Sequence, residues 1–564
     1  MNCYLQNHRI EAFDLILKVD TSSKEGLKNE SRDTSSILRS VRAIIELIEG
    51  LLSGSAETIS KSLDEFWAAE KLANDSKDRE WLGNRISRGL SYMFGGLVQL
   101  FIGSYVKASF NLTFGYKLIR SFEKDVVNYS EESDCDLIRS LGLLVLALVN
   151  FFAIILPPSV VAVGEMLGVG PSQSKFTEYL RMCSEENGSF SYMAKLIEVY
   201  SVINSKNFTF SKISQNDLSR CRTLMDECLA VAPNSVVIRV MNASVCLGEG
   251  RSKEAIDTLS SPEISEVINR PEWSTMRLAV AYKLGVAYIC RFEFEKASKA
   301  FSSAARSIQS SGGWHYIPFM RALEGVSFLA AVSQSPELYP HVSSIRNKVL
   351  DIFMPCYQDR DLTNTIVLPG DYWGSRMGHE MSVRLNSDLE NDEKFSLWLK
   401  EKNPISDIMF VTITCLYQFD KVSLDMLKQF IESVKNVTGS GKLEVVRGEY
   451  YRRIERYNKS VAAFDEALSI ADGTDIDKDS VIGFSLVFQG AALCKAGEKE
   501  TSIEVLKDLD EEMAKNKSVL SWKTSAPKTI SGIKPGNLVK PLGGEFDLIL
   551  SLRRNGLKRL IDES

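Results

Sequence analysis

The chain has 564 residues, of which 44% are apolar and 25% charged, as is ordinary for a globular protein. Its 67 basic and 73 acidic residues leave a net charge of −6, so no basic excess points to nucleic acid and no strong acidity points to disorder. The ten cysteines are scattered without a Cys-x-x-Cys pair, and the first residues lack the long apolar core of a signal peptide. We therefore expect reduced cysteines in the core and a cytoplasmic location, with nuclear or organelle-surface placement as the alternative.

A helical region is predicted for residues 1–175. Residues 3–17 have the pattern of a helical hairpin. Apolar residues then recur at helical spacing through 37–52, 56–72 and 79–124. These segments predict a group of packed helices ahead of the more regular part of the chain.

The most apolar stretch spans residues 140–164 and carries no charge. One interpretation is a membrane-anchoring helix, and the other is a helix buried on all sides within a helical domain. Pro157-Pro158 favours burial, because a helix over residues 141–156 is about 24 Å long, shorter than the roughly 30 Å hydrocarbon core. We predict a buried helix in which Asn150 finds a backbone carbonyl.

Residues 277–306 have the spacing of a tetratricopeptide repeat, which places a helix, a tight turn and an antiparallel helix in about 34 residues. Gly285 and Ala297 are small where the two helices would approach most closely, and larger residues fill the space beside them. The positions that define this repeat are Leu284, Gly285, Tyr288, Ala297, Phe301 and Ala304.

A single hairpin cannot bury its apolar face alone, so stacked copies are expected over residues 176–514. Residues 339–380 break the pattern and are predicted to form an irregular insertion. The predicted fold class is all-α, a tetratricopeptide-like α-solenoid of antiparallel helix hairpins with a helical N-terminal region. The repeat positions in the two clearest later copies are Gly448, Tyr451, Phe464, Ala467 and Gly490.

The last part of the chain changes character. Residues 515–544 contain six lysines and no acidic residue, with three prolines and four glycines, which predicts a loop. This loop is either simply solvated or a contact for an acidic partner or anionic surface. Residues 545–564 predict a basic amphipathic helix that caps the solenoid.

No motif for catalysis is present. The four histidines are dispersed, and no His-Glu-x-x-His occurs. Residues 438–442 resemble a phosphate-binding loop, but Asn436 stands where that loop needs glycine and Leu443 where it needs Ser or Thr. We predict a protein that is not an enzyme, with no catalytic residue, no cofactor and no metal site.

The order of these parts resembles the tetratricopeptide repeat protein 39 family, which includes the fungal inclusion body clearance proteins. The match begins almost at Met1, whereas the family has further helical sequence before it, and residues 339–380 and 515–544 fit the family poorly. The resemblance implies an all-helical repeat protein that acts through protein partners. For fungal members it also implies clearance of protein inclusions and a link to lipid droplets. The matching segments are residues 5–12, 92–96, 108–110, 156–157, 167–170, 272–273, 282–285 and the hairpin at Gly448.

These observations predict a scaffold or adaptor that binds a peptide or helix of another protein in the solenoid groove. The groove is predicted at Tyr282, Val286 and Ile289, whose apolar or aromatic side chains argue against a chaperone carboxylate clamp. Two alternatives stay open: a membrane-associated helical repeat protein anchored through residues 140–164, with peripheral or lipid-droplet contact, and an enzyme whose site no motif reveals.

Overall fold

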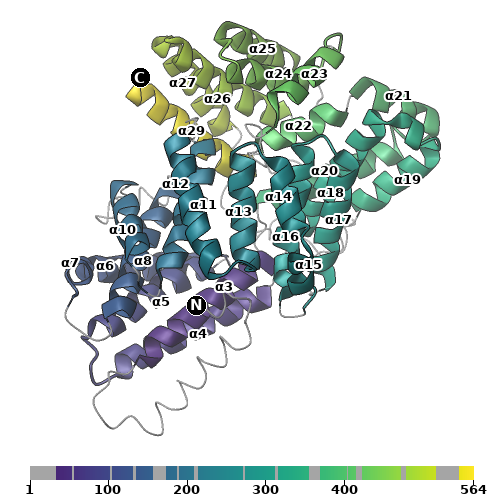
Figure 1. Ribbon diagram of the computed structural model, residues 1–564. Helices are drawn as coiled ribbons and strands as arrows, with labels where there is room; N and C mark the ends of the chain where they lie inside the picture. Colours follow the sequence, from purple (N-terminus) through teal and green to yellow (C-terminus); the bar gives the residue numbers. More distant parts are fainter. Residues whose placement is uncertain are drawn as a thin grey trace.

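The computed structural model describes residues 34–564 with internal gaps, and every regular element in the described residues is a helix (Figure 1). The all-α fold class is confirmed. The predicted hairpin at residues 3–17 lies outside the described residues, as does the predicted loop beyond Lys515. The gaps fall at residues 54–55, 102–103, 131–134, 156–172, 187, 189, 209–213, 271–272, 311–315, 355–368, 403, 415–421, 438, 472–477 and 516–544.

The N-terminal part is a group of helices in which α3, α4, α5 and α6 each pack against the next along the chain. With the labels of Figure 1, its members are α3 (Ser35–Ser53), α4 (Ala56–Asp75), α5 (Leu82–Phe101), α6 (Tyr105–Ser121), α7 (Glu123–Val127) and α8 (Cys135–Ile155).

The middle of the chain continues as antiparallel hairpins. Its first helix, α10, packs against α8, so the boundary predicted at residue 175 lies inside a packed pair of helices. These helices are α10 (Gln173–Glu185), α11 (Ser191–Phe208), α12 (Gln215–Val231), α13 (Val236–Gly248), α14 (Ser252–Leu259), α15 (Pro262–Ile268), α16 (Ser274–Ile289), α17 (Phe294–Ser310) and α18 (Ile317–Gln334).

The last part also consists of helices, some of which pack mainly on their chain neighbours and others mainly on α18 or on helices further along the chain. After a short 3₁₀ turn at Pro336–Leu338, its helices are α19 (Val342–Phe353), α20 (Pro369–Asn386), α21 (Asp392–Lys402), α22 (Pro404–Thr414), α23 (Leu424–Ser433), α24 (Gly441–Arg453), α25 (Tyr457–Ile470), α26 (Lys478–Ala496), α27 (Lys499–Lys515) and α29 (Glu545–Glu563).

The prediction of an irregular insertion at residues 339–380 needs correction where the structure describes it. Residues 342–353 form α19, and α20 begins at Pro369. Both helices pack against α18, and Gly374 weakens the helical sequence pattern within α20. A Cβ on this glycine would lie 2.3 Å from the carbonyl carbon of Pro318, so close packing of backbones requires a poor helix former here.

The hairpin of α16 and α17 is held together by a glycine that faces an aromatic ring. A Cβ on Gly285 would lie 2.5 Å from Cε1 of Phe301, so the ring uses the space that a side chain would take. The hairpin of α24 and α25 repeats this arrangement, with 2.4 Å between a Cβ on Gly448 and Cε1 of Phe464. Both rings are fully buried. These pairs let the two helices of each hairpin pack closely.

The position twelve residues after each of these glycines is also small. It is the fully buried Ala297 in the first hairpin and Ser460 in the second. The Ser460 hydroxyl donates to the carbonyl oxygen of Gly448 at 2.8 Å. In the hairpin of α26 and α27, Ser502 donates in the same way to Gly490 at 2.9 Å. A small residue or a serine therefore joins the two helices at the same point of each hairpin.

Four hairpin turns share one backbone geometry, in which one residue has a positive φ. The next residue donates its N–H to the carbonyl oxygen five positions earlier, at distances of 2.8 to 3.0 Å. This is the Schellman arrangement that ends many helices. The left-handed residues are Gly250 (φ 75°), Phe292 (58°), Glu455 (59°) and Gly497 (88°).

Residues 138–150 of α8 lie mostly in the core, as the sequence predicts for this apolar stretch. Leu141 is 0% exposed and Val145 1%, and the Asn150 amide donates to the carbonyl oxygen of Leu146 at 2.8 Å. A Cβ on Gly142 would meet Val126 at 2.7 Å, so α7 lies close against this helix. Among the described residues, no helix has the length and hydrophobicity needed to cross a membrane.

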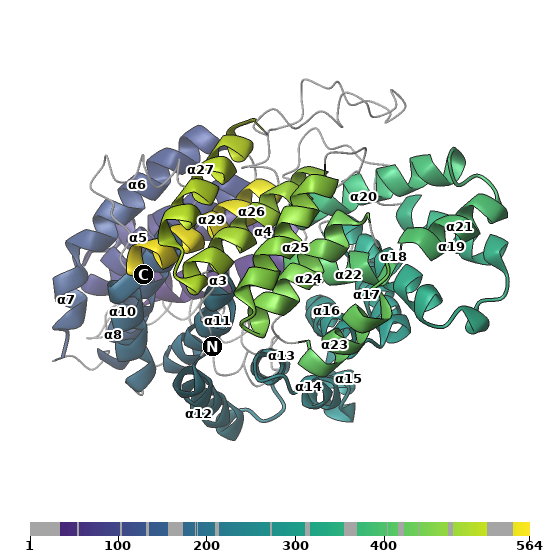
Figure 2. The same ribbon diagram turned by 90° about the horizontal axis from the view of Figure 1, so that it is seen from above.

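Both ends of the described chain contact its middle. Helix α3 packs against α16, and α29 packs against α26 and α27 but also touches α20 and α11. Figures 1 and 2 show α3 below the row of α11, α13 and α16, with α29 beside α26. The terminal helix is therefore more than an end cap, because it joins the last hairpin to helices far away in the sequence.

Candidate interaction surfaces

The groove predicted at Tyr282, Val286 and Ile289 needs correction. Val286 is 1% exposed and Ile289 0%, and both belong to an apolar core that also contains Ile37 and Val41 of α3. The Tyr282 ring lies 6.3 Å from the Phe301 ring. These side chains stabilise the packing of the chain's own helices, and α3 packs against the same helix, α16.

The other predicted repeat positions contribute to packing within the fold. Leu284 packs against the core, and Ala304 and Ala467 are fully buried. Tyr288 is half-buried, with the Lys296 ammonium 5.6 Å from its ring centre, and Tyr451 has the equivalent contact with Lys459 at 5.9 Å. A Cβ on Gly490 would lie 2.7 Å from Leu557, so this glycine makes room for α29.

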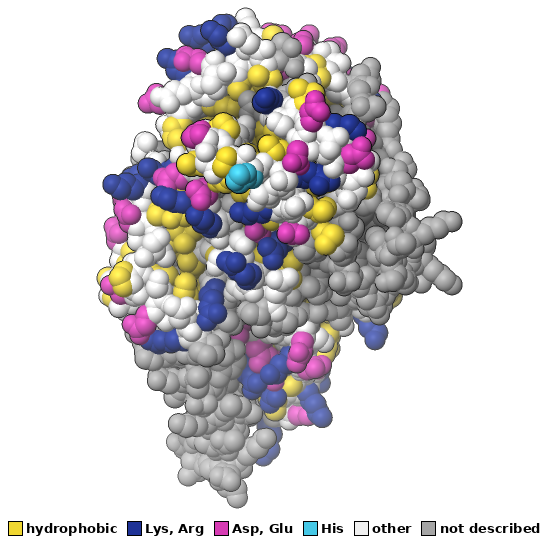
Figure 3. Space-filling view, turned by 90° about the vertical axis from the view of Figure 1, so that its right-hand side faces the viewer, with side chains coloured by type: hydrophobic (Ala, Val, Ile, Leu, Met, Phe, Trp, Pro, Cys, Tyr) yellow, Lys and Arg dark blue, Asp and Glu magenta, His cyan; other side chains and the backbone are white. Residues whose placement is uncertain are grey.

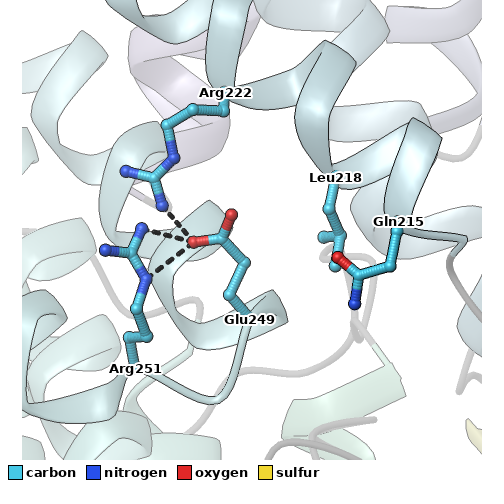
Figure 4. A pocket seen from close by; sticks show the side chains of 5 residues that line it. All are labelled: Gln215, Leu218, Arg222, Glu249 and Arg251. Atoms are coloured by element: carbon cyan, nitrogen blue, oxygen red, sulfur yellow. Dashed lines mark hydrogen bonds and ion pairs between the residues drawn. The ribbon is translucent and has the colours of Figure 1, made fainter.

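An open cleft of about 540 Å³ lies at α12 and the turn between α13 and α14. Its lining residues are Gln215, Leu218, Arg222, Glu249 and Arg251 (Figure 4). Figure 4 shows one oxygen of the Glu249 carboxylate facing both guanidinium groups, with Gln215 and Leu218 on the opposite side. Arg251 donates to Glu249 through Nε at 2.8 Å, and Arg222 donates to the same oxygen.

The charges of this cleft are already paired. Besides its bonds to Glu249, Arg251 contacts Glu254 at 2.5 Å. Two arginines and two glutamates therefore neutralise one another, and the Arg222–Glu249 pair ties α12 to the turn that follows α13. The arrangement stabilises the tertiary structure and leaves no free cation for an anionic ligand among these residues.

A different surface is formed by α6, on which three large apolar side chains are exposed in one line. Val106 is 72% exposed, Phe110 74% and Phe114 52%. Their spacing of four residues puts them on one face of the helix, and we call them the α6 ridge. The other large exposed apolar residues of the described chain stand singly on seven different elements, as expected of an ordinary surface.

Close packing on α5 determines which face of α6 points outward. A Cβ on Gly115 would lie 2.7 Å from the backbone nitrogen of Met93, and one on Gly96 would lie 2.9 Å from Leu112. Asn111 donates to the Gln99 side chain at 2.7 Å. These contacts put α6 tightly against α5, and the ridge is left on the opposite side.

An aromatic row connects the α6 ridge to the neighbouring helices. The Trp67 ring of α4 lies 5.7 Å from the Tyr92 ring of α5, which lies 4.7 Å from Phe114. The Tyr92 hydroxyl donates to Glu70 at 3.0 Å. Burial raises the pKa of Tyr92, and the bond to the Glu70 carboxylate raises it further. These contacts hold the rings in place, and the row ends at the exposed Phe114.

The charged residues of α6 are all basic. Its sequence contains Lys107, Lys117 and Arg120 and no acidic residue. Arg120 pairs with Glu123 at 2.6 Å. Lys107 and Lys117 are exposed and make no ion pair with the described residues. A basic strip thus flanks the apolar ridge in a chain whose net charge is −6.

The opposite side of the molecule has a different surface. Figure 3 views the right-hand side of Figure 1, whereas Figure 2 shows α6 at the left-hand rim. The described part of that opposite face mixes Lys and Arg with Asp and Glu, and its apolar side chains are interspersed among them. The combination of an apolar line with charges of one sign therefore distinguishes the α6 surface.

Groups for chemistry are not gathered in the described residues. No set of three His, Cys, Asp or Glu side chains there could hold a metal ion. Cys183 is buried, and removal from water raises the pKa of its thiol to about 12. Burial raises the pKa of Cys228 and Cys246 to about 11. These thiols are protonated at neutral pH, so they fit the predicted role of reduced core residues.

The α6 ridge was not predicted from the sequence. Residues 79–124 were assigned only to a group of packed helices. The available signal was the spacing of Val106, Phe110 and Phe114, combined with Ala108, Leu112 and Gly115 on the other face. A helix that is apolar on two sides predicts two neighbours, and among the described residues only α5 packs closely against α6.

Comparison with known proteins identifies no family for this chain. No protein-family model matches the sequence, and no curated protein matches it. The tetratricopeptide repeat protein 39 resemblance therefore remains a prediction from the sequence. Solved structures that match include a human IFIT1 dimer with m7Gppp-AAAA, at 13% identity over 89% of this chain and 94% of that chain. The TM-score is 0.32, too low to support an inference about this protein.

Proposed function

We propose that this protein is a non-catalytic scaffold that binds other proteins, and that the α6 ridge is a binding surface. The observation that carries the proposal is the exposed line of Val106, Phe110 and Phe114 on a helix whose other face is packed. Aligned exposed apolar side chains beside aromatic rings are typical of protein interfaces. The helical hairpins supply a rigid frame that holds this surface in place.

The test is affinity purification of the full chain from cells, followed by mass spectrometry. The double variant Phe110→Ser/Phe114→Ser removes the centre of the ridge. The matched control Val383→Ser/Leu397→Ser removes two other exposed apolar side chains, which are 48% and 56% exposed. We expect the ridge variant to lose a set of proteins that the control keeps. Identical sets for wild type and ridge variant would contradict the proposal.

The cellular process is a separate hypothesis. Clearance of protein inclusions, with a link to lipid droplets, is supported by the sequence resemblance described above and by no feature of the described residues. Cells that lack the protein should then retain aggregates of a reporter protein, and wild-type protein should restore clearance. If the ridge variant restores clearance equally well, the process does not depend on the α6 surface.

A further inference from the structure

We propose that the α6 ridge docks an amphipathic helix of a partner protein whose apolar stripe is flanked by acidic residues. The inference rests on the proposed function, since it names the partner that the same surface would take. It commits to a helix and to a charge sign, and each can be tested separately.

The position of α6 in its layer argues for a helical partner. Helix α4 packs between α3 and α5, and α5 between α4 and α6. Helix α6 has α5 on one side and meets α7 and α8 only weakly. Its ridge therefore lies where the next helix of the layer would stand. Side chains four residues apart form a ridge that fits the groove on a second helix, which matches the spacing of Val106, Phe110 and Phe114.

The aromatic row supplies anchoring points for such a helix. Phe114 lies against Tyr92, and Tyr92 is oriented by its hydrogen bond to Glu70. Tyr92 also contacts the Trp67 ring, which stands against Gly95, where a Cβ would be only 3.2 Å away. Rings held in this way lose little conformational freedom on binding, and aromatic residues dominate the energetics of many interfaces.

The charges argue for an acidic partner. Lys107 and Lys117 flank the ridge, while Arg120 is already paired with Glu123. Acidic residues beside the partner's apolar stripe would complement the two lysines, and this would increase both specificity and association rate. A second copy of this chain is a poorer match. An isologous pairing of α6 with itself would bring a helix without acidic residues against an identical basic one.

A lipid surface is also a poorer match than a helix. A flat bilayer is wider than one helix, whereas the line of exposed large apolar side chains lies on α6 alone. A helix can contact the ridge alone. Binding to vesicles in place of a helix would therefore contradict the inference.

The experiment is selection of helical peptides from a displayed random library against the full chain, with counter-selection against Phe110→Ser/Phe114→Ser. We expect enriched peptides to have apolar residues at helical spacing with Asp or Glu beside them. Their affinity should fall about tenfold or more on the Phe110→Ser/Phe114→Ser variant. On Lys107→Glu/Lys117→Glu it should fall several-fold, most strongly at low salt. The control Val383→Ser/Leu397→Ser should bind like wild type.

Three binding results would overturn the inference, as would the dimer described next: no ridge-dependent peptide, enriched peptides without an acidic bias, or stronger binding of phosphatidylserine vesicles than of any peptide. Size-exclusion chromatography with light scattering tests the second copy, and a dimer lost in the ridge variant would also overturn it. Circular dichroism should show that all variants keep their helices, since every substituted side chain is exposed. If cellular partners depend on the ridge while charge reversal changes nothing, the scaffold function stands and the acidic partner is wrong.

Discussion

Helices α6 and α17 are each 17 residues long, and each carries two phenylalanines, yet they have opposite surroundings. Phe301 of α17 is 0% exposed and Phe110 of α6 is 74% exposed. Helix α17 packs between α16 and α18, whereas α6 packs mainly against α5. A phenylalanine therefore stabilises the fold in α17 and forms part of the surface in α6. The difference comes from the number of helices that pack around the helix that carries it.

The largest expected effect comes from one substitution made in both helices. Phe301→Ala should lower the free energy of unfolding by about 3–5 kcal/mol, because it leaves a cavity against Gly285. Phe110→Ala should change it by less than about 0.5 kcal/mol, because its ring is exposed. Chemical and thermal denaturation of the two variants measure the difference. Equal destabilisation would contradict the contrast between the two helices.

Two substitutions at Ala297 test the contact between α16 and α17, one through side-chain size and the other through hydrogen bonding. Ala297→Phe should overpack a fully buried position and cost about 1–3 kcal/mol or more. Ala297→Ser should cost less than about 1 kcal/mol, because a serine there can donate to the Gly285 carbonyl. Ser460 and Ser502 make that bond in the other hairpins. An unchanged thermal midpoint for Ala297→Phe would show that the repeat is wrongly placed here.

The Lys283 side chain on α16 tests how strongly the folded helices shield a charged group from water. It is half-buried, and removal from water lowers its pKa from 10.5 to about 8. Above pH 8 the unfolded chain therefore holds a proton that the folded chain has released, so the free energy of unfolding should rise between pH 8 and 10.5.

Lys283→Met should remove that pH-dependent rise and stabilise the protein at pH 7 by about 1–3 kcal/mol, allowing for partial exposure. Lys107→Met on α6 serves as the control and should change stability by less than about 0.5 kcal/mol, since Lys107 is exposed. Denaturation midpoints from pH 7 to 10.5 measure both effects. A rise that persists in Lys283→Met must come from other groups.

The smallest effects are expected at the hairpin turns in which one residue has a positive φ. Gly497 has φ 88° with open space around it, so Gly497→Ala should destabilise by about 1 kcal/mol through backbone strain alone. Glu455 has φ 59° at the equivalent position, so Glu455→Gly should stabilise by up to about 1 kcal/mol. Thermal unfolding of both variants, measured side by side, tests the shared turn. Shifts of the same sign would contradict it.

Much of the fold could be predicted from local sequence. The pairs Gly285–Phe301 and Gly448–Phe464 have the same spacing, and the structure places each glycine under its ring. Helix α8 was predicted to be buried because Pro157-Pro158 leaves its apolar run too short to span a membrane. Helix α20 was missed because Gly374 lowers local helix propensity, and its packing against Pro318 overrides that propensity.

The binding surface was much less accessible to sequence reasoning. Val286 and Ile289 were assigned to a groove, although α3, more than 200 residues earlier in the chain, packs on their helix. Residues 79–124 were assigned to a group of packed helices, although Val106 and Phe110 are exposed. Both errors have one cause: a pattern shows that a face is apolar and does not show what lies against it.

The amino-acid sequence by itself determined where helices form, how the hairpins turn and which side chains are apolar, because these depend on residues within about one repeat length of one another. Only the tertiary structure decided that α3 covers α16, that α29 reaches α11 and α20, and that the α6 ridge remains open. Burial depends on neighbours that are distant in the chain. A surface for partners is therefore a property of the assembled fold and not of the helix that carries it.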